Sequence, residues 1–594
     1  MSLLCILNRT PPLFLICGLY FAGLFHVHFM SVGGDFNSRN IFGWITLALG
    51  NLLLWWRPFK TNQMSKPRYF ILAFLLPVLF LTLWLLPFFS PNIANTLTPQ
   101  IYYIFPFLLL FFGMFILGGL QAPLSNRQWR TLLLLIGFAV LPQTLQVFFK
   151  FLNLDLTLLY RVFPSIIFRD YLGFSQENLM GSFLASLIGL FGWAVYRLCD
   201  AGVGDKRARG FFYGLSFIYA FLIFFNGSKL AVLGLLLMMA MFWAYVLWQG
   251  GAWRYVVNWS LMIGLAFLCK SFVPFLFSDV AGVTQGWDVQ GSSVQLRLDM
   301  WYVSWLAFLD APYFGHGIGS FFHIYMDKYA ALGPDSGISF KENLSNPHNL
   351  IILLLVEAGL IGTVLILMPY IALMIYLVWR NPRLFILPIL LGPILVHCLL
   401  EYPYFSSSSH YLIFALTCLA ILHYYGGPEN KVVFSHKKLM FQSGFIKNLM
   451  AGLGVGVIIV FCFFAVPASW QDRTGAIRFH MMQSKSTFEI LARRFQHSDM
   501  KHSLIGPRQT TLTVLYLMQR AIEENEKDLL KTVLLPIYEE KVKPFYSSSK
   551  LWHIEFDALV LLSDESKIQA LIDYVRPYRP KLSEEFEAKL SLRQ

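Results

Sequence analysis

The stretch Ser345-Asn346-Pro347-His348-Asn349-Leu350 is followed without a break by an apolar run that ends at Trp379. An Asn side chain can accept backbone N–H groups at the start of a helix, and Pro has no N–H to lose in the first turn. The pattern therefore predicts Asn346 as the N-cap, Pro347 as the first helical residue, and one membrane helix over the whole apolar run.

His348 is expected in the first turn of this helix. The positive end of a helix dipole disfavours the imidazolium, so a neutral imidazole at this place can accept a proton. Glu357 follows roughly 13 Å deeper at ~1.5 Å per residue, where an ionisable group needs a partner or a function. The plainer interpretation of the stretch is a well-capped membrane helix with a hydrogen-bonded His and a buried acid.

The composition excludes a soluble globular protein, because 57% of the 594 residues are hydrophobic and only 13% are charged. The formal net charge of +13 comes from Lys and Arg that gather in short loops between apolar runs. This is the positive-inside pattern of membrane proteins, so no nucleic-acid partner is predicted. The seven cysteines lie in or beside apolar runs, which predicts neither a disulfide framework nor a metal–thiolate site.

About thirteen apolar runs are long enough to cross a membrane. They cover residues 13–30, 41–56, 69–89, 101–120, 131–149, 179–196, 211–225, 230–247, 255–277, 350–379, 384–400, 411–425 and 449–466. The basic loops alternate, which places the N-terminus in the cytoplasm and the end of the chain outside. We therefore predict an all-α polytopic membrane domain over residues 1–466 with a large outer loop at 278–349, and a soluble helical domain over residues 467–594.

The large outer loop contains an amphipathic stretch, Val294 to Leu309, which carries Arg297 and Trp301. A helix with this pattern is expected to lie in the membrane interface. The glycine-rich turn from Pro312 to Gly319 follows it. This turn is not a dinucleotide-binding fingerprint, since neither a strand before it nor the helix of a βαβ unit after it is predicted.

The other unusual polar residues also fall on the expected outer side. They are Arg169 and Asn178 before the sixth apolar run, Ser228 and Lys229 between the seventh and eighth, and His397 and Glu401 at the end of the eleventh. Fixed cations at a partly desolvated site on the outer side of the membrane domain suit a diphosphate, because charge-assisted hydrogen bonds are strong. As alternatives, the cations are snorkelling interface charges and Glu401 caps a helix end. The sequence has no outward D-x-D pair, Walker loop or Ser-His-Asp elbow, so transfer without a metal or cofactor is predicted.

Together, these motifs resemble the O-antigen ligase and polymerase (Wzy_C-like) superfamily. The resemblance rests on Asn346 to Leu350, Glu357 to Gly362, Arg297…Trp301 and Pro312 to Gly319. Within it, His397-x-x-x-Glu401-Tyr402-Pro403 and the polar C-terminal segment resemble PglL-type O-linked oligosaccharyltransferases. The resemblance implies a GT-C-like bundle in the bacterial inner membrane and an undecaprenyl-diphosphate-linked glycan donor. It also implies transfer on the periplasmic face to Ser or Thr of exported proteins such as pilin.

The resemblance also implies roles for single residues. His348 matches the family's essential His, with Arg297 as an arginine of the large periplasmic loop. Arg169 and Asn178 match a further Arg and a following Asn. Ser228-Lys229 stands where a Ser-Arg pair is usual, and Lys keeps the charge but loses the bidentate fork.

Other functions stay open at this point. Within the same chemistry, the chain is also interpretable as an O-antigen ligase with a lipid A core acceptor, or as a glycan polymerase. In another class, a transporter of the lipid-linked glycan would show inverted repeats and broken helices at mid-membrane.

Overall fold

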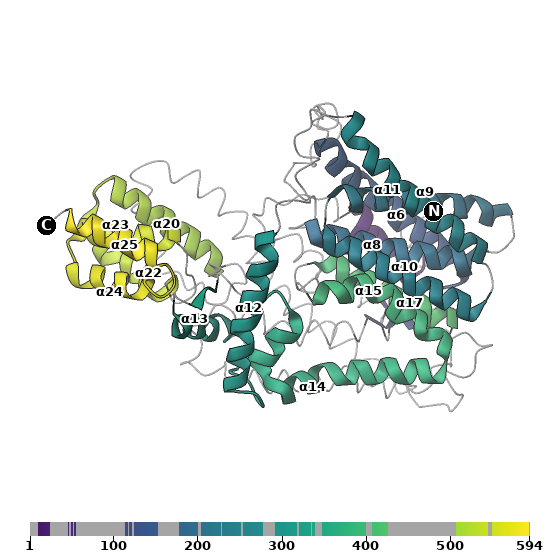
Figure 1. Ribbon diagram of the computed structural model, residues 1–594. Helices are drawn as coiled ribbons and strands as arrows, with labels where there is room; N and C mark the ends of the chain where they lie inside the picture. Colours follow the sequence, from purple (N-terminus) through teal and green to yellow (C-terminus); the bar gives the residue numbers. More distant parts are fainter. Residues whose placement is uncertain are drawn as a thin grey trace. The chain divides into compact units, whose positions relative to one another are not determined.

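The structure of the chain is a computed structural model. The described residues are 10–23, 46, 49–50, 53–54, 113, 115–116, 118–120, 124–151, 177–199, 203–226, 228–250, 253–276, 291–317, 320–333, 336–338, 347–399, 407–425, 506–543 and 549–592. Over these residues the chain is helical and contains no strand (Figure 1), which confirms the all-α prediction for this part.

The contacts within the chain divide it into two units, which are described separately. Unit 1 combines Met1–Val78, Phe107–Val289 and Leu367–Cys462. Unit 2 combines Leu79–Pro106, Gln290–Ile366 and Phe463–Gln594. The predicted boundary at residue 467 is not the boundary of these units, because the C-terminal helices group with residues 290–366. A separate C-terminal domain therefore stays a prediction.

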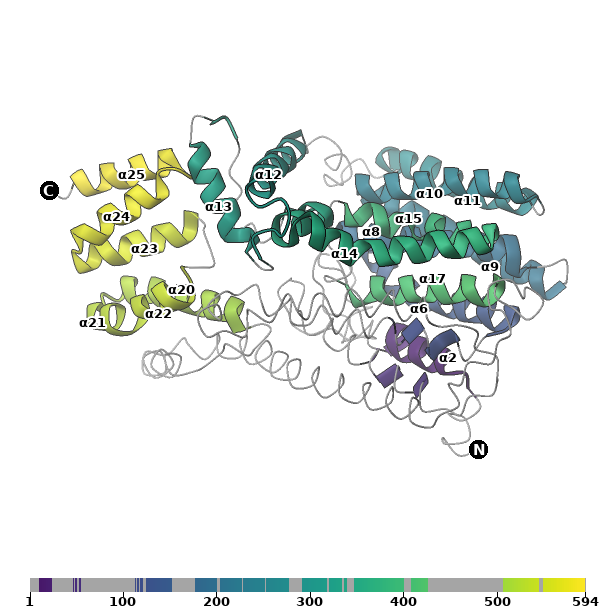
Figure 2. The same cartoon turned by 90° about the horizontal axis from the view of Figure 1, so that it is seen from below.

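Unit 1 is a bundle built around one central helix. Its helices and short π or 3₁₀ segments are α2 (Pro12–Cys17), η1 (Gly18–Gly23), α6 (Asn126–Phe151), α8 (Glu177–Trp193), η4 (Ala194–Leu198), α9 (Val203–Asn226), α10 (Lys229–Gln249), α11 (Trp253–Leu276), η6 (Pro382–Phe385), α15 (Ile386–Cys398) and α17 (Ser408–Tyr425). α8 packs against α9, α10, α15 and α17 (Figures 1 and 2). It is buried along its whole span because apolar and small residues cover all its faces.

Several helices of the chain are long and apolar enough to cross a membrane. Among the described residues they are Asn178–Leu198, Lys206–Phe225, Lys229–Gln249, Trp253–Phe272 and Leu350–Arg380. Shorter apolar helices at Pro12–Phe21, Pro382–Cys398 and Ser409–Tyr425 fall on further predicted spans. The chain is thus a multi-pass membrane protein. The predicted spans 69–89 and 449–466 lie outside the described residues, so the total of thirteen stays a prediction.

The apolar run that begins at Leu350 forms two helices, so the prediction of one continuous helix is wrong. α14 (Leu350–Arg380) is interrupted at Gly359, whose φ of 66° and ψ of −175° are not helical. At ~1.5 Å per residue the arm before the break is about 13 Å long and the arm after it about 31 Å. Only the second arm has the length of a membrane span.

Unit 2 contains α12 (Gly291–Asp310), α13 (Phe321–Leu332) and the first arm of α14. It also contains α20 (Gly506–Glu523), α21 (Lys527–Leu529), η7 (Leu530–Leu534), α22 (Leu535–Lys541), α23 (Ser549–Leu562), α24 (Glu565–Val575) and α25 (Pro580–Ser591), which we call the C-terminal cluster. α12 covers the predicted amphipathic stretch. It buries Met300 and Ala307 and exposes Leu298 and Trp305, as expected for an interfacial helix.

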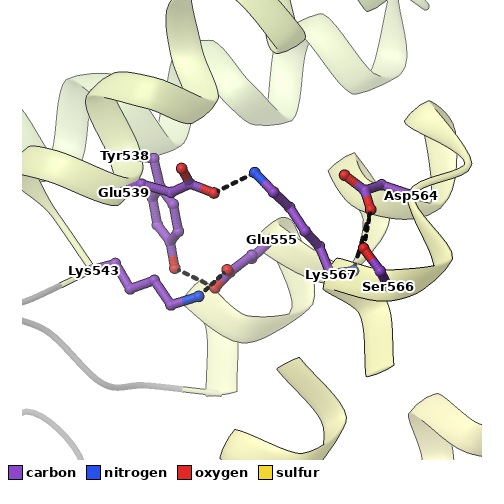
Figure 3. Close-up of polar contacts among 7 residues, drawn as sticks. All are labelled: Tyr538, Glu539, Lys543, Glu555, Asp564, Ser566 and Lys567. Carbon is purple, nitrogen blue, oxygen red and sulfur yellow. Dashed lines mark hydrogen bonds and ion pairs between the residues drawn. The ribbon is translucent and has the colours of Figure 1, made fainter. Parts of the chain in front are cut away.

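The C-terminal cluster has an apolar core and one buried carboxylate. Phe556 and Phe586 stack inside it with ring centroids 4.2 Å apart. The buried Glu555 accepts hydrogen bonds from the Tyr538 hydroxyl at 2.9 Å and from Lys543 Nζ at 2.5 Å (Figure 3). A buried carboxylate is tolerated only when it is paired in this way. Residues 467–505 of the predicted soluble domain lie outside the described residues.

Candidate functional site

The predicted site residues fall into both units, and each group is described by itself. Arg297 and His348 belong to unit 2. Asn178, Ser228, Lys229 and His397 belong to unit 1. Arg169 and Glu401 lie outside the described residues, so their predicted roles stay predictions.

His348 lies two residues before the first residue of α14, Leu350, rather than in its first turn. The cap is Asn349, whose side-chain oxygen accepts the amides of Ile351 at 3.0 Å and Ile352 at 3.1 Å. The predicted cap at Asn346 and first helical residue at Pro347 were wrong, because Asn349 binds the N–H groups two and three residues further on, which is the geometry of an N-cap. His348 itself has a φ of 49°, which is uncommon for a residue with a side chain.

The backbone beside His348 is held by α12. The Trp301 indole N–H donates to the carbonyl of Pro347 at 2.9 Å. Arg297 lies one helical turn before Trp301 and therefore on the same face of α12. The Arg297 side chain is half-buried, and no described carboxylate pairs with its guanidinium.

The glycine-rich turn after α12 fills the break in α14. The amides of His316 and Gly317 donate to the carbonyls of Val356 and Glu357, both at 2.9 Å. In return, the amide of Leu360 donates to Pro312 at 2.8 Å, and that of Ile361 donates to Tyr313 at 3.1 Å. A broken helix leaves such groups without intrahelical partners, and unpaired backbone groups are costly when buried. The turn at 312–317 therefore stabilises the break.

Two glycines allow the turn and the break to approach this closely. Gly315 and Gly359 both have positive φ, at 68° and 66°. A Cβ on Gly315 would overlap the backbone of Glu357 and Gly359, and a Cβ on Gly359 would overlap the backbone of Tyr313 and Gly315. Glycine is needed here both for the conformation and for the space.

Glu357 has a structural role in the described part of the chain. Its side chain is buried, and its Oε1 accepts the amide of Phe321 at 3.2 Å. Phe321 is the first residue of α13, so the carboxylate caps that helix from another element. A negative group at a helix N-terminus is stabilising, by about 0.3–2 kcal/mol.

In unit 1 the structure brings two predicted site residues together. The Ser228 hydroxyl donates to Asn178 Oδ1 at 2.7 Å and accepts the amide of Ala231 at 3.3 Å, so Ser228 is also the N-cap of α10. Lys229 follows it and is exposed. The sequence had placed Asn178 and Ser228 only on the same side of the membrane.

His397 is fully buried and belongs to a chain of polar side chains. Ser182 Oγ lies 2.6 Å from His397 Nδ1 and 2.8 Å from His410 Nε2. Ser182 and His410 were not among the predicted site residues. The spacing of Ser182, four residues after Asn178 on a helix, was the available signal, since residues four apart share a helix face.

The chemistry of the two groups differs. Arg297 and His348 are both half-buried, on segments that the bond from Trp301 to Pro347 connects, while His397 is enclosed by protein. Among the described residues, no cluster of three His, Cys, Asp or Glu side chains is placed to hold a metal ion. Whether the reaction needs a metal is a separate question, and its independence of metals stays a prediction.

Comparison with known families supports the superfamily prediction. Residues 214–367 match the sequence model of the O-antigen ligase family, Wzy_C. The matched segment contains Ser228, Lys229, Arg297 and His348, together with the turn at 312–317 and the break at Gly359. No curated protein matches the chain. The family match supports a glycosyltransferase-like activity at the general level.

Proposed function

We propose that this chain transfers a glycan from undecaprenyl diphosphate to Ser or Thr hydroxyls of exported proteins such as pilin. The reaction takes place on the periplasmic face of the bacterial inner membrane. The family match supports glycan transfer in general. The protein acceptor is proposed from the resemblance to PglL-type enzymes and from the polar C-terminal cluster.

His348 is the general base of this proposal. It accepts the proton of the acceptor hydroxyl, the oxygen attacks the anomeric carbon, and the bond from that carbon to the diphosphate oxygen breaks. The lipid diphosphate leaves with the bonding electron pair, and the anomeric configuration is inverted. The observation that carries the proposal is the hydrogen bond from Trp301, one helical turn after Arg297 on α12, to the carbonyl of Pro347 beside the half-buried His348.

The cations of the site hold the leaving diphosphate. Lys229 is exposed and Arg297 is half-buried. We assign the same diphosphate-binding role to Arg169. Guanidinium groups bind phosphate oxygens through two parallel hydrogen bonds, whereas Lys229 acts as a point charge. Asn178 and Ser228 orient this part of the donor site. His397 and Glu401 complete the catalytic residues of the proposal.

A transporter of the lipid-linked glycan is the candidate from another class. Transporters use broken helices whose free backbone groups bind the substrate or ion. The break in α14 gives its four backbone groups to the turn at 312–317 instead. Because these backbone groups are already hydrogen-bonded within the protein, the arrangement favours an enzyme over a transporter.

Co-expression tests the reaction and its acceptor. The chain is expressed with a polyprenyl-diphosphate glycan pathway and either a pilin or a lipid A core acceptor, as wild type and as His348→Ala. We expect a mass increase of pilin that disappears in the variant, because general-base catalysis contributes about 10²–10⁴-fold. A lipopolysaccharide ladder with unmodified pilin would instead assign an O-antigen ligase, and longer lipid-linked chains would assign a polymerase.

A further inference from the structure

α13 connects the break in α14 to the C-terminal cluster within unit 2 (Figure 2). At its first residue the helix is tied to α14, since the Phe321 amide donates to Glu357. Ser320, which precedes the helix, makes no side-chain cap and instead donates its hydroxyl to the carbonyl of Gly317. The start of α13 is therefore fixed by the first arm of α14 and by the turn at 312–317.

A column of stacked rings runs from this point along α13 and into the cluster. Phe321 and Tyr325 have ring centroids 5.7 Å apart, and Tyr325 and Tyr329 have centroids 6.4 Å apart. Tyr329 stacks on Tyr578 at 6.2 Å, and Tyr578 stacks on Trp552 at 6.1 Å. These separations are those of favourable offset aromatic pairs. The four-residue spacing on α13 places its three rings on one face.

The column is buried and uncharged. All five side chains are buried, and the Tyr329 hydroxyl is fixed by a hydrogen bond to the carbonyl of Ile338 at 2.9 Å. Burial raises the pKa of the Tyr325, Tyr329 and Tyr578 hydroxyls above the ordinary value, so the phenols are neutral at physiological pH. Rings have few rotatable bonds, which makes such a column stiff.

The contact between Phe321 and Glu357 also connects α13 to the segment that contains His348. Glu357 lies near the end of the first arm of α14, a single short helix, and His348 lies two residues before that arm begins. A displacement of α13 at Phe321 would therefore shift the first arm of α14, which begins two residues after His348. A flexible linker would suffice for a cluster with no part in the reaction.

We propose that α13 holds the C-terminal cluster in register with His348, with Glu357 as the positioning residue of this contact, and that the cluster binds the folded acceptor protein. The inference rests on the proposed transfer reaction. The donor is anchored in the membrane and reaches the site from there. Exposed ion pairs, among them Arg576 with Asp573 and with Glu587, lie on α24 and α25, so a folded protein in water can reach this part of the cluster.

The first test separates two acceptors of the same enzyme in proteoliposomes. One is a folded pilin, and the other is a short peptide that contains the modified Ser. Tyr578→Leu and Tyr329→Leu each remove one ring from the contact between α13 and the cluster. We expect the KM for folded pilin to rise about tenfold, the loss of roughly one stacked pair, while the KM for the peptide and for the donor stays unchanged.

A matched control lies inside the cluster but outside the column. Phe586→Leu removes a ring that stacks on Phe556 and leaves Tyr578 in place, so the KM for pilin should stay within about twofold of wild type. An unchanged KM for pilin in both column variants would overturn the inference. An equal rise of the KM for pilin and of the KM for the peptide would also overturn it. Tyr329→Leu breaks the same contact from α13 should Tyr578→Leu fail to fold.

Glu357 is tested by a conservative and a disruptive variant. Glu357→Gln keeps an acceptor oxygen for the Phe321 amide, whereas Glu357→Leu does not. We expect kcat to fall about tenfold or more in Glu357→Leu and to stay within about threefold of wild type in Glu357→Gln, because a small displacement of a catalytic group is costly. Equal loss in both variants would contradict a positioning role. His348→Ala activity toward the peptide tests the transfer reaction itself, so the two failures are distinguishable.

Discussion

Unit 1 and the α14 region of unit 2 hold their candidate residues by different means. In unit 1, side chains on regular helices bond to one another, as in Asn178 with Ser228 and Ser182 with two histidines. In unit 2, a turn bonds to a broken helix through four backbone hydrogen bonds. Side chains can be replaced one at a time, whereas a backbone contact is sensitive to any atom added at the two glycines. The second arrangement should therefore tolerate substitution least.

Gly359→Ala should have the largest effect on stability. The added Cβ overlaps the backbone of Tyr313 and Gly315, and alanine is strained at a φ of 66°. Strain of this kind costs about 1–3 kcal/mol, and a clash with backbone adds to it, so we expect a loss of about 3–5 kcal/mol. Thermal unfolding in detergent measures it.

The control for this change is Gly264→Ala in α11. Gly264 has open space where its Cβ would be, and its φ is not positive. Alanine is favoured over glycine in a helix, so the midpoint of unfolding should stay the same or rise. An equal loss of stability in Gly264→Ala and Gly359→Ala would show that the contact between the turn and the break does not stabilise the protein.

Ser182→Ala should have an intermediate effect. It removes the hydroxyl between His397 and His410 and leaves buried ring nitrogens with one partner fewer. The loss of a buried partner costs about 1–3 kcal/mol, and bonds between membrane helices lie at the lower end, so about 1–2 kcal/mol is expected. Unfolding in detergent measures this change against Ser271→Ala, whose hydroxyl is exposed. No difference between the two variants would contradict the role of the polar chain.

The bond between Asn178 and Ser228 should give the smallest effect. A double-mutant cycle with Asn178→Ala and Ser228→Ala isolates it from the separate loss of the α10 cap. We expect a coupling free energy of about 0.5–1 kcal/mol in the same unfolding assay. Strictly additive effects would mean that the two side chains do not stabilise each other.

The sequence predicted the elements that depend on hydropathy and missed those that depend on contacts between distant segments. The amphipathic helix at Val294 to Leu309 and several membrane spans followed from apolar patterns. The break at Gly359 did not, because the surrounding residues are apolar and favour one long helix. Only the partner turn makes the break stable, and no local pattern describes it.

The candidate site shows the same limit. His348 and Arg297 stood out as polar residues in conspicuous places, and the structure connects their segments through Trp301 and Pro347. The cap at Asn349 was misassigned to Asn346 because both are Asn residues beside the same Pro and His. Ser182 and His410 were missed because a Ser and a His in apolar helices look ordinary until three helices meet.

The most direct measurement compares kcat of wild type, His348→Ala and His323→Ala in proteoliposomes with a lipid-linked glycan and a Ser peptide. His323 is a half-buried histidine of α13 and serves as the matched control. A general base in His348 predicts a fall of about 10²–10⁴-fold for His348→Ala, with an unchanged unfolding midpoint, and near-normal rates for His323→Ala. A His348→Ala enzyme within about threefold of wild type would contradict the assignment of His348 as the base and leave it a structural residue before the helix.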